Sequence, residues 1–97
     1  MTTKRQEVYV AIDGERAYQA IVCKIEPRTI GDYLVILDTY LRKAKDAYLY
    51  EGKGEGNMSQ SSLQQVRKIA AVAVSCMEDH GAPTRVIPEE VAETIPW

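Results

Sequence analysis

Basic and aromatic side chains are the residues of this chain whose types and spacing best suit chemistry on a ligand. Arginine and lysine bind phosphate oxygens, and tyrosine rings stack on nucleotide bases. If the segments on either side of the glycine-rich stretch 51–58 pair in opposite directions, their basic residues come to similar heights. We therefore predict a site for a phosphate-bearing ligand, placed between subunits. The predicted contacts are Arg67, Lys68, Arg42 and Lys45, with Tyr40 and Tyr33 beside them.

An alternative interpretation leaves these charges in solvent. Asp38 and Arg42 are four residues apart, a spacing at which opposite charges pair on a helix surface. Basic side chains at helix edges also cover apolar surface while their charged ends stay hydrated. In this interpretation the basic residues bind no ligand.

The acidic residues offer little for a metal ion. Asp38 and Asp46 share a broad helix face, whereas Asp32 and Asp38 match a helix poorly, and Glu15 lies in another segment. Magnesium is held by oxygen ligands in near-octahedral geometry, which these spacings do not supply. The sequence therefore predicts solvated acids and no metal site, with a site built from these four carboxylates as the alternative.

Other residues with reactive side chains are isolated. His80 is the one histidine, and its place near a predicted helix end favours a capping role over catalysis. Cys23 and Cys76 match no metal-ligand spacing, and we expect both to be reduced. The connector EGKGEG lacks the GK(S/T) ending of a phosphate loop. We predict no catalytic set of residues.

The element that positions Arg67 and Lys68 is predicted to be a helix over 59–81. Ser62 followed by Gln65 forms a capping box, and Gly81 suits the left-handed conformation that ends a helix. The predicted apolar face comprises Leu63, Val66, Ile69, Ala70, Ala73, Met77 and His80, and the opposite face carries Lys68, Ser75 and Asp79.

The element that carries the tyrosines is predicted to be a helix over 29–50. Thr29 with Asp32 three residues later resembles an N-terminal cap. Apolar residues recur in near-heptad order, and a second set widens the face, which is typical of a helix with two neighbours. The first set is Ile30, Leu34, Leu37, Leu41, Ala44 and Tyr48, and the second is Tyr33, Ile36, Tyr40 and Ala47.

A first helix is predicted over 3–25, within an N-terminal helical segment 1–26. Its apolar stripe turns polar in the middle, at Glu15 and Gln19. Gly14 weakens a helix interior by about 1 kcal/mol, so a kink or two short helices are alternatives. A strand over 18–25 is a further alternative, because β-branched residues cluster there.

These elements predict a single all-α domain over 1–97: an antiparallel helical hairpin plus an N-terminal helix. Residues 51–58 form the connector, and 84–97 a short helical or flexible tail. Such helices do not easily close a core alone, and helical hairpins commonly pair across a two-fold axis. We predict a helical bundle formed as a homo-oligomer, most simply a dimer.

Composition excludes several classes of partner. The formal net charge is -2, so the chain has no overall attraction to DNA or RNA. It has no run of apolar residues long enough to span a membrane and no export signal pattern, so we expect a cytoplasmic protein.

Three segments resemble small phage-borne and mobile-element proteins described as MazG-like. They are RQEVYVAIDGERAYQ (5–19), IGDYLVILDTYLRKAKDAY (30–48) and VRKIAAVAVSCMEDHGAPTR (66–85), which together make up a little more than half of the chain. The resemblance implies an all-α oligomer, and active members of the superfamily hydrolyse nucleoside triphosphates with magnesium held by acidic motifs. Here Gln65, Arg67 and Lys68 stand where the resemblance implies an acidic pair before the apolar run.

Two functions follow as predictions. The first is a non-catalytic homo-oligomer of phage or mobile-element type that binds a nucleotide or cyclic nucleotide signal and needs no cofactor. The alternative is a MazG-like, magnesium-dependent nucleoside triphosphate pyrophosphohydrolase. The departure from the acidic motifs favours the first.

Overall fold

The computed structural model describes residues 2–22, 28–50 and 57–89. Within these ranges the chain forms three helices and no strand: α1 (Lys4–Val22), α2 (Ile30–Tyr50) and α3 (Asn57–His80). The prediction of an all-α fold is confirmed for this part of the chain. None of the described helices is long and apolar enough to cross a membrane.

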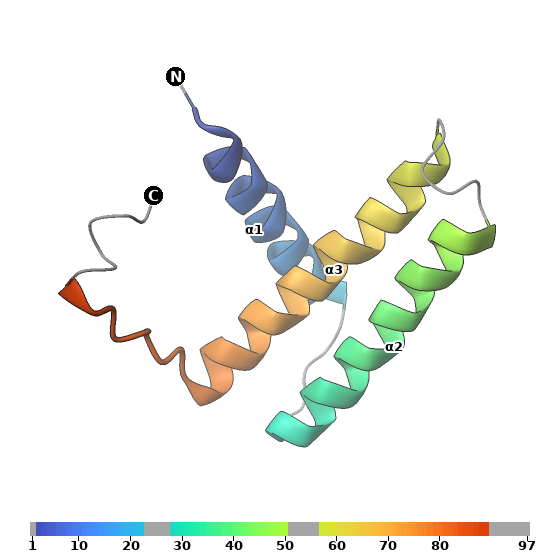
Figure 1. The fold of residues 1–97 in the computed structure, drawn as a ribbon. Coiled ribbons are helices and arrows are strands. Elements are labelled where there is room, and N and C mark those ends of the chain that lie inside the picture. The colour runs from blue at the N-terminus through green and yellow to red at the C-terminus, as the bar shows by residue number, and fades with distance from the viewer. Residues whose placement is uncertain (1, 23–27, 51–56, 90–97) are drawn as a thin grey trace.

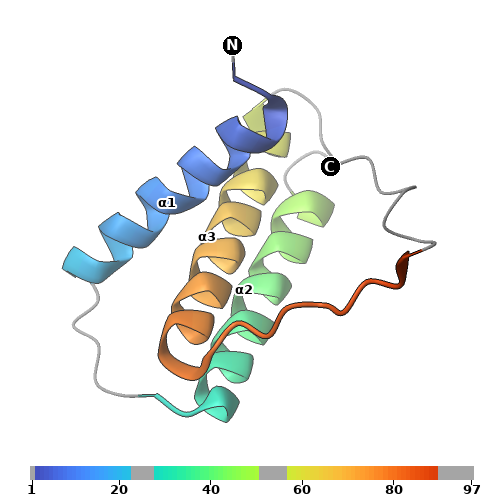
Figure 2. The same cartoon turned by 90° about the vertical axis from the view of Figure 1, so that its left-hand side faces the viewer.

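α3 is the central helix. It packs against both α1 and α2, whereas α1 and α2 do not pack against each other in the described ranges. α2 lies beside α3 with the opposite chain direction, and α1 crosses α3 obliquely on one side of the pair (Figures 1 and 2). The predicted connector lies almost wholly outside the described residues, at 51–56.

The first turns of α1 and α2 are closed by reciprocal side-chain caps. The Gln6 amide donates to Thr3 Oγ1 (3.1 Å), and the Thr3 amide donates to Gln6 Oε1 (2.7 Å). Thr29 and Asp32 make the same exchange at 3.1 and 3.0 Å, which confirms the predicted cap. These hydrogen bonds to Thr29 lower the pKa of the Asp32 carboxyl from its usual value of 3.8.

The end of α3 agrees with the prediction, but its start does not. Gly81 has φ 112°, and its amide donates to the Met77 carbonyl at 2.8 Å, closing the helix after His80. The helix begins at Asn57, so Ser62 lies inside it, and the Ser62 hydroxyl and the Gln65 side-chain carbonyl are buried without a partner. The predicted capping box is wrong, because residues 57–61 contain no glycine or proline to stop the helix earlier.

α1 runs unbroken through Gly14, so neither a kink nor two helices is needed. The strand alternative is wrong as far as Val22, where α1 ends. Residues 23–27 lie outside the described ranges. A single glycine costs about 1 kcal/mol, which the intact hydrogen-bond ladder of a 19-residue helix accommodates.

The packing faces of α2 and α3 differ from those predicted. Ser75 of the supposed polar face is 5% exposed, whereas Met77 of the supposed apolar face is 44% exposed. On α2, Tyr33 from the second apolar set is buried and Leu34 from the first is exposed. The reason is that α3 contacts two helices, and its small Ser75 side chain permits close approach while Tyr33 satisfies its hydroxyl. The buried hydrophobic residues of the described ranges are Tyr33, Ala44, Ala71 and Val72.

Beyond α3, residues 81–88 have no regular secondary structure, and Val86 is 92% exposed. The helical turn predicted from Pro88 falls mostly on 90–97, outside the described residues, as does Trp97.

Candidate ligand-binding cavity

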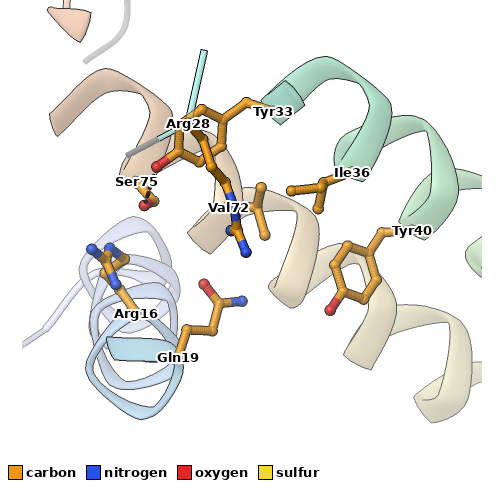
Figure 3. A pocket seen from close by; sticks show the side chains of 8 residues that line it. All are labelled: Arg16, Gln19, Arg28, Tyr33, Ile36, Tyr40, Val72 and Ser75. Atoms are coloured by element: carbon orange, nitrogen blue, oxygen red, sulfur yellow. Dashed lines mark hydrogen bonds between the residues drawn. The ribbon is translucent and has the colours of Figure 1, made fainter. Parts of the chain in front are cut away.

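A cavity of about 240 Å³ lies where the three helices meet. α1 contributes two of its side chains, the segment leading into α2 and α2 itself contribute four, and α3 contributes two (Figure 3). The lining residues are Arg16, Gln19, Arg28, Tyr33, Ile36, Tyr40, Val72 and Ser75.

Tyr33 forms the floor of this cavity and is 1% exposed. Its hydroxyl donates to the Asp79 carboxylate and lies 3.0 Å from Ser75 Oγ, so Ser75 is left to donate to the tyrosine oxygen. Burial, followed by the hydrogen bond to Asp79, raises the pKa of the Tyr33 phenol above its usual value of 10.0. The phenol therefore stays protonated at neutral pH and joins α2 to α3.

His80 fixes the backbone that carries Arg28. Its Nε2 lies 2.7 Å from the Arg28 carbonyl oxygen, to which it donates, and its ring meets the Tyr33 ring edge-on at 6.0 Å between centroids. His80 therefore lies at the end of α3, as predicted, but its ring binds the backbone of the segment that precedes α2. The Arg28 side chain points into the cavity (Figure 3), and none of the described residues forms an ion pair with it.

Arg16 and Gln19 bring the polar side of α1 to the cavity. Arg16 Nε lies 2.6 Å from Glu78 Oε1 at the C-terminal end of α3, while Arg16 Nη1 is buried without a hydrogen-bond partner. Gln19 Nε2 donates to the Lys68 carbonyl at 3.5 Å. A buried donor without a partner is costly, so the cavity presents a cationic group with a hydrogen bond to give.

Of the predicted site residues, the two tyrosines lie together in this cavity. Tyr40 lines it about two helical turns along α2 from Tyr33, with Lys43 Nζ 5.3 Å from the Tyr40 ring centroid. Lys68 is half-buried, and its backbone carbonyl, as noted, holds Gln19. Lys45 is exposed on α2.

The other two predicted basic residues lie elsewhere and have acidic partners. Arg67 Nε is 2.8 Å from Glu15 Oε1 in the contact between α1 and α3. Arg42 is paired with Asp38 at 3.2 Å on the exposed side of α2, as the alternative interpretation predicted. The predicted basic residues therefore do not share one cavity with the tyrosines in the described structure.

Sequence reasoning missed Arg16, Gln19, Arg28 and Ser75. A signal existed for the first two: the stripe of α1 turns polar in its middle, and residues three apart share a helix face. Polar residues in a packing stripe are expected to meet a polar cavity. No comparable pattern marks Arg28, which precedes the helix cap.

The acidic residues do not gather in the described ranges. No group of three or more histidine, cysteine, aspartate or glutamate side chains lies close enough there to hold a metal ion. Glu15, one of the candidate ligands, has an 8% exposed side chain and is engaged by Arg67. Two further acids three residues apart, Glu90 and Glu93, lie outside the described residues.

The cavity can hold an anion against guanidinium, amide and hydroxyl donors, with tyrosine rings beside it. No family model, curated protein or solved structure matches this chain. The resemblance to MazG-like proteins therefore stays a prediction.

Proposed function

We propose that this protein is a non-catalytic helical homo-oligomer that binds a phosphate group of a nucleotide or cyclic nucleotide in the cavity between its three helices. We retain the phage or mobile-element type and the antiparallel hairpin as parts of this proposal. The observation that carries it is the Arg28 guanidinium, directed into a cavity that also holds Arg16 and two tyrosines.

The two guanidinium groups are the features of the cavity that favour an anion. Glu78 is paired with Arg16, while Arg28 has no ion-pair partner among the described residues, although its charge acts on the nearby Asp32 carboxylate. Guanidinium groups bind phosphate through paired N–H donors, and both Arg16 and Arg28 line the cavity. Gln19 and Ser75 add polar groups on two other sides.

The size of the cavity indicates which part of a ligand enters it. Small-molecule pockets commonly measure about 300–1,000 Å³. A volume of about 240 Å³ therefore suits one phosphate and its neighbouring group rather than a whole nucleotide. A base would lie at the rim, where Tyr40 presents its ring for stacking.

This proposal differs in two respects from the sequence prediction. The ligand lies between helices of one chain instead of between subunits, and Arg16 and Arg28 replace Arg42, Lys45, Arg67 and Lys68 as phosphate contacts. The two tyrosines are retained.

Calorimetric titration tests the proposal. The probes are nucleoside triphosphates, cyclic dinucleotides, cyclic trinucleotides and inorganic phosphate, each with and without magnesium, and product formation is followed in the same samples. We expect binding without turnover. Arg28→Ala should weaken the affinity about 10- to 100-fold, the loss of one charged hydrogen-bonded contact.

Arg42→Ala is the matched control, because it removes the same side chain from an exposed position paired with Asp38. Equal affinity of Arg28→Ala and the wild type for a bound probe would overturn the cavity as the site. The absence of binding by every probe would overturn it too. Magnesium-dependent release of pyrophosphate would overturn the non-catalytic proposal and favour the hydrolase.

A further inference from the structure

α2 leaves a strongly apolar flank in solvent. Four large side chains on this flank are each 46–59% exposed. We call them the free face: Ile30, Leu34, Leu41 and Tyr48.

The free face lies on the side of the α2–α3 pair that α1 does not cover. Tyr33 and Tyr40 point to the cavity in which the Arg16 side chain from α1 lies (Figure 3). Leu34 and Leu41 each follow a tyrosine by one residue, which turns them about 100° around the helix. That turn directs them away from α1, which lies across the other face (Figures 1 and 2).

We infer that the free face binds a second copy of this chain through an antiparallel contact between the two α2 helices, on a two-fold axis at Leu41. The inference rests on the homo-oligomer in the proposed function and names its interface. Leu34, Leu41 and Tyr48 are seven residues apart, symmetric about the middle one. A copy turned by 180° therefore sets Leu41 against the partner's Leu41 and Leu34 against the partner's Tyr48.

Charges beside this stripe are complementary to themselves under the same rotation. Asp38 precedes Leu41 by three residues, and Lys45 follows it by four, so both project along one edge of the stripe. The two-fold axis brings Asp38 opposite the partner's Lys45, and does so twice. The Asp38 side chain is 68% exposed in the single chain, so it stays accessible to this second cation. This symmetry is expected of an isologous contact and favours a second copy over an unrelated protein.

Sedimentation equilibrium of the full chain, without ligand, tests the inference. We expect a dimer for the wild type. Leu41→Glu places two carboxylates against each other in an apolar contact and should weaken dimerisation at least about 100-fold. Val35→Glu is the matched control: residue 35 is on the same helix and 67% exposed, but outside the free face, so the dimer should persist.

A charge exchange tests the register. Asp38→Lys should weaken the dimer about tenfold, because two attractive pairs become repulsive, and Lys45→Asp in the same chain should restore it. Disulfide formation gives an independent readout. In a background with Cys23→Ser and Cys76→Ser, Leu41→Cys should link two chains much faster than Val35→Cys.

The outcomes separate the interface from the proposed function. A monomeric wild type would overturn both the homo-oligomer and this interface, while leaving the ligand cavity of the single chain to be judged by calorimetry. A dimeric wild type that Leu41→Glu leaves dimeric, or equal linking rates for the two cysteine variants, would overturn this interface alone.

Discussion

Removing one oxygen atom from Tyr33 is expected to destabilise the fold measurably. The Tyr33→Phe variant loses the hydrogen bond to the Asp79 carboxylate and leaves the Ser75 hydroxyl, 3.0 Å away, without its partner. A hydrogen bond to a charged group contributes about 1.5–3 kcal/mol, and a neutral one about 0.5–1.5 kcal/mol. Asp79 is exposed and can hydrogen-bond to water in the variant, so the sum of the two losses lies near the lower end of these ranges. We expect a loss of about 2 kcal/mol.

Urea denaturation followed by circular dichroism measures this loss. For a domain of this size, about 2 kcal/mol corresponds to a fall in Tm of roughly 8–16 °C. Tyr18→Phe is the control, because it removes the same atom from an exposed ring outside both the cavity and the free face. Both variants must be compared at one protein concentration, since assembly adds to apparent stability.

This prediction fails if Tyr33→Phe and Tyr18→Phe unfold with the same free energy. It also fails if Tyr33→Phe and Asp79→Ala are additive in the double variant. Residues that share a hydrogen bond are expected to couple, because the second substitution removes an interaction that the first has already broken.

The remaining predictions concern pH and capping. The pKa of Tyr33 is raised on folding, so its contribution to stability is complete below the unfolded pKa near 10.0 and is lost as pH rises through the folded pKa. Urea denaturation between pH 8 and 11 should therefore show a steeper fall in unfolding free energy for the wild type than for Tyr33→Phe. Thr29→Ala should cost about 1 kcal/mol in urea denaturation through loss of the cap. The pKa of Asp32 is lowered on folding, so its contribution to stability is lost as pH falls below 3.8. Thr29→Ala should reduce this acid-side loss without abolishing it, because the backbone amide of residue 29 still donates to the Asp32 carboxylate.

The sequence predicts those features whose causes lie within a few residues. Thr29 and Asp32 satisfy each other's backbone amides across one turn, and Gly81 takes a conformation that other residues avoid, so both helix ends could be identified. The start of α3 at Asn57 was not predicted, because it depends on where the glycine-rich connector ends and the helix begins. Serine is tolerated on either side of that boundary, so the serines do not mark it.

The packing faces could not be derived from apolar periodicity alone. Periodicity orders side chains around one helix, but it does not say how many neighbours the helix has. α3 has two, so Ser75 on its supposedly polar face is buried between them while Met77 is left in solvent. The misassigned faces also explain why the basic residues were misplaced in the site hypothesis: Arg67 turned out to face Glu15 of α1.

The helix that completes the cavity is also the least anchored of the three. α1 has no buried residue, and its contacts with α3 include the Arg16–Glu78 pair, the pair between Glu15 and Arg67, and the long Gln19 hydrogen bond. Arg28, by contrast, is held by His80 at the well-connected end of the α2–α3 pair. An anion bound by both arginines would therefore join α1 to that pair, and by linkage its binding free energy would add to the docking of α1. The cavity and the position of α1 thus depend on each other: Arg16 reaches the ligand only while α1 is docked, and α1 is held more firmly while the ligand is bound.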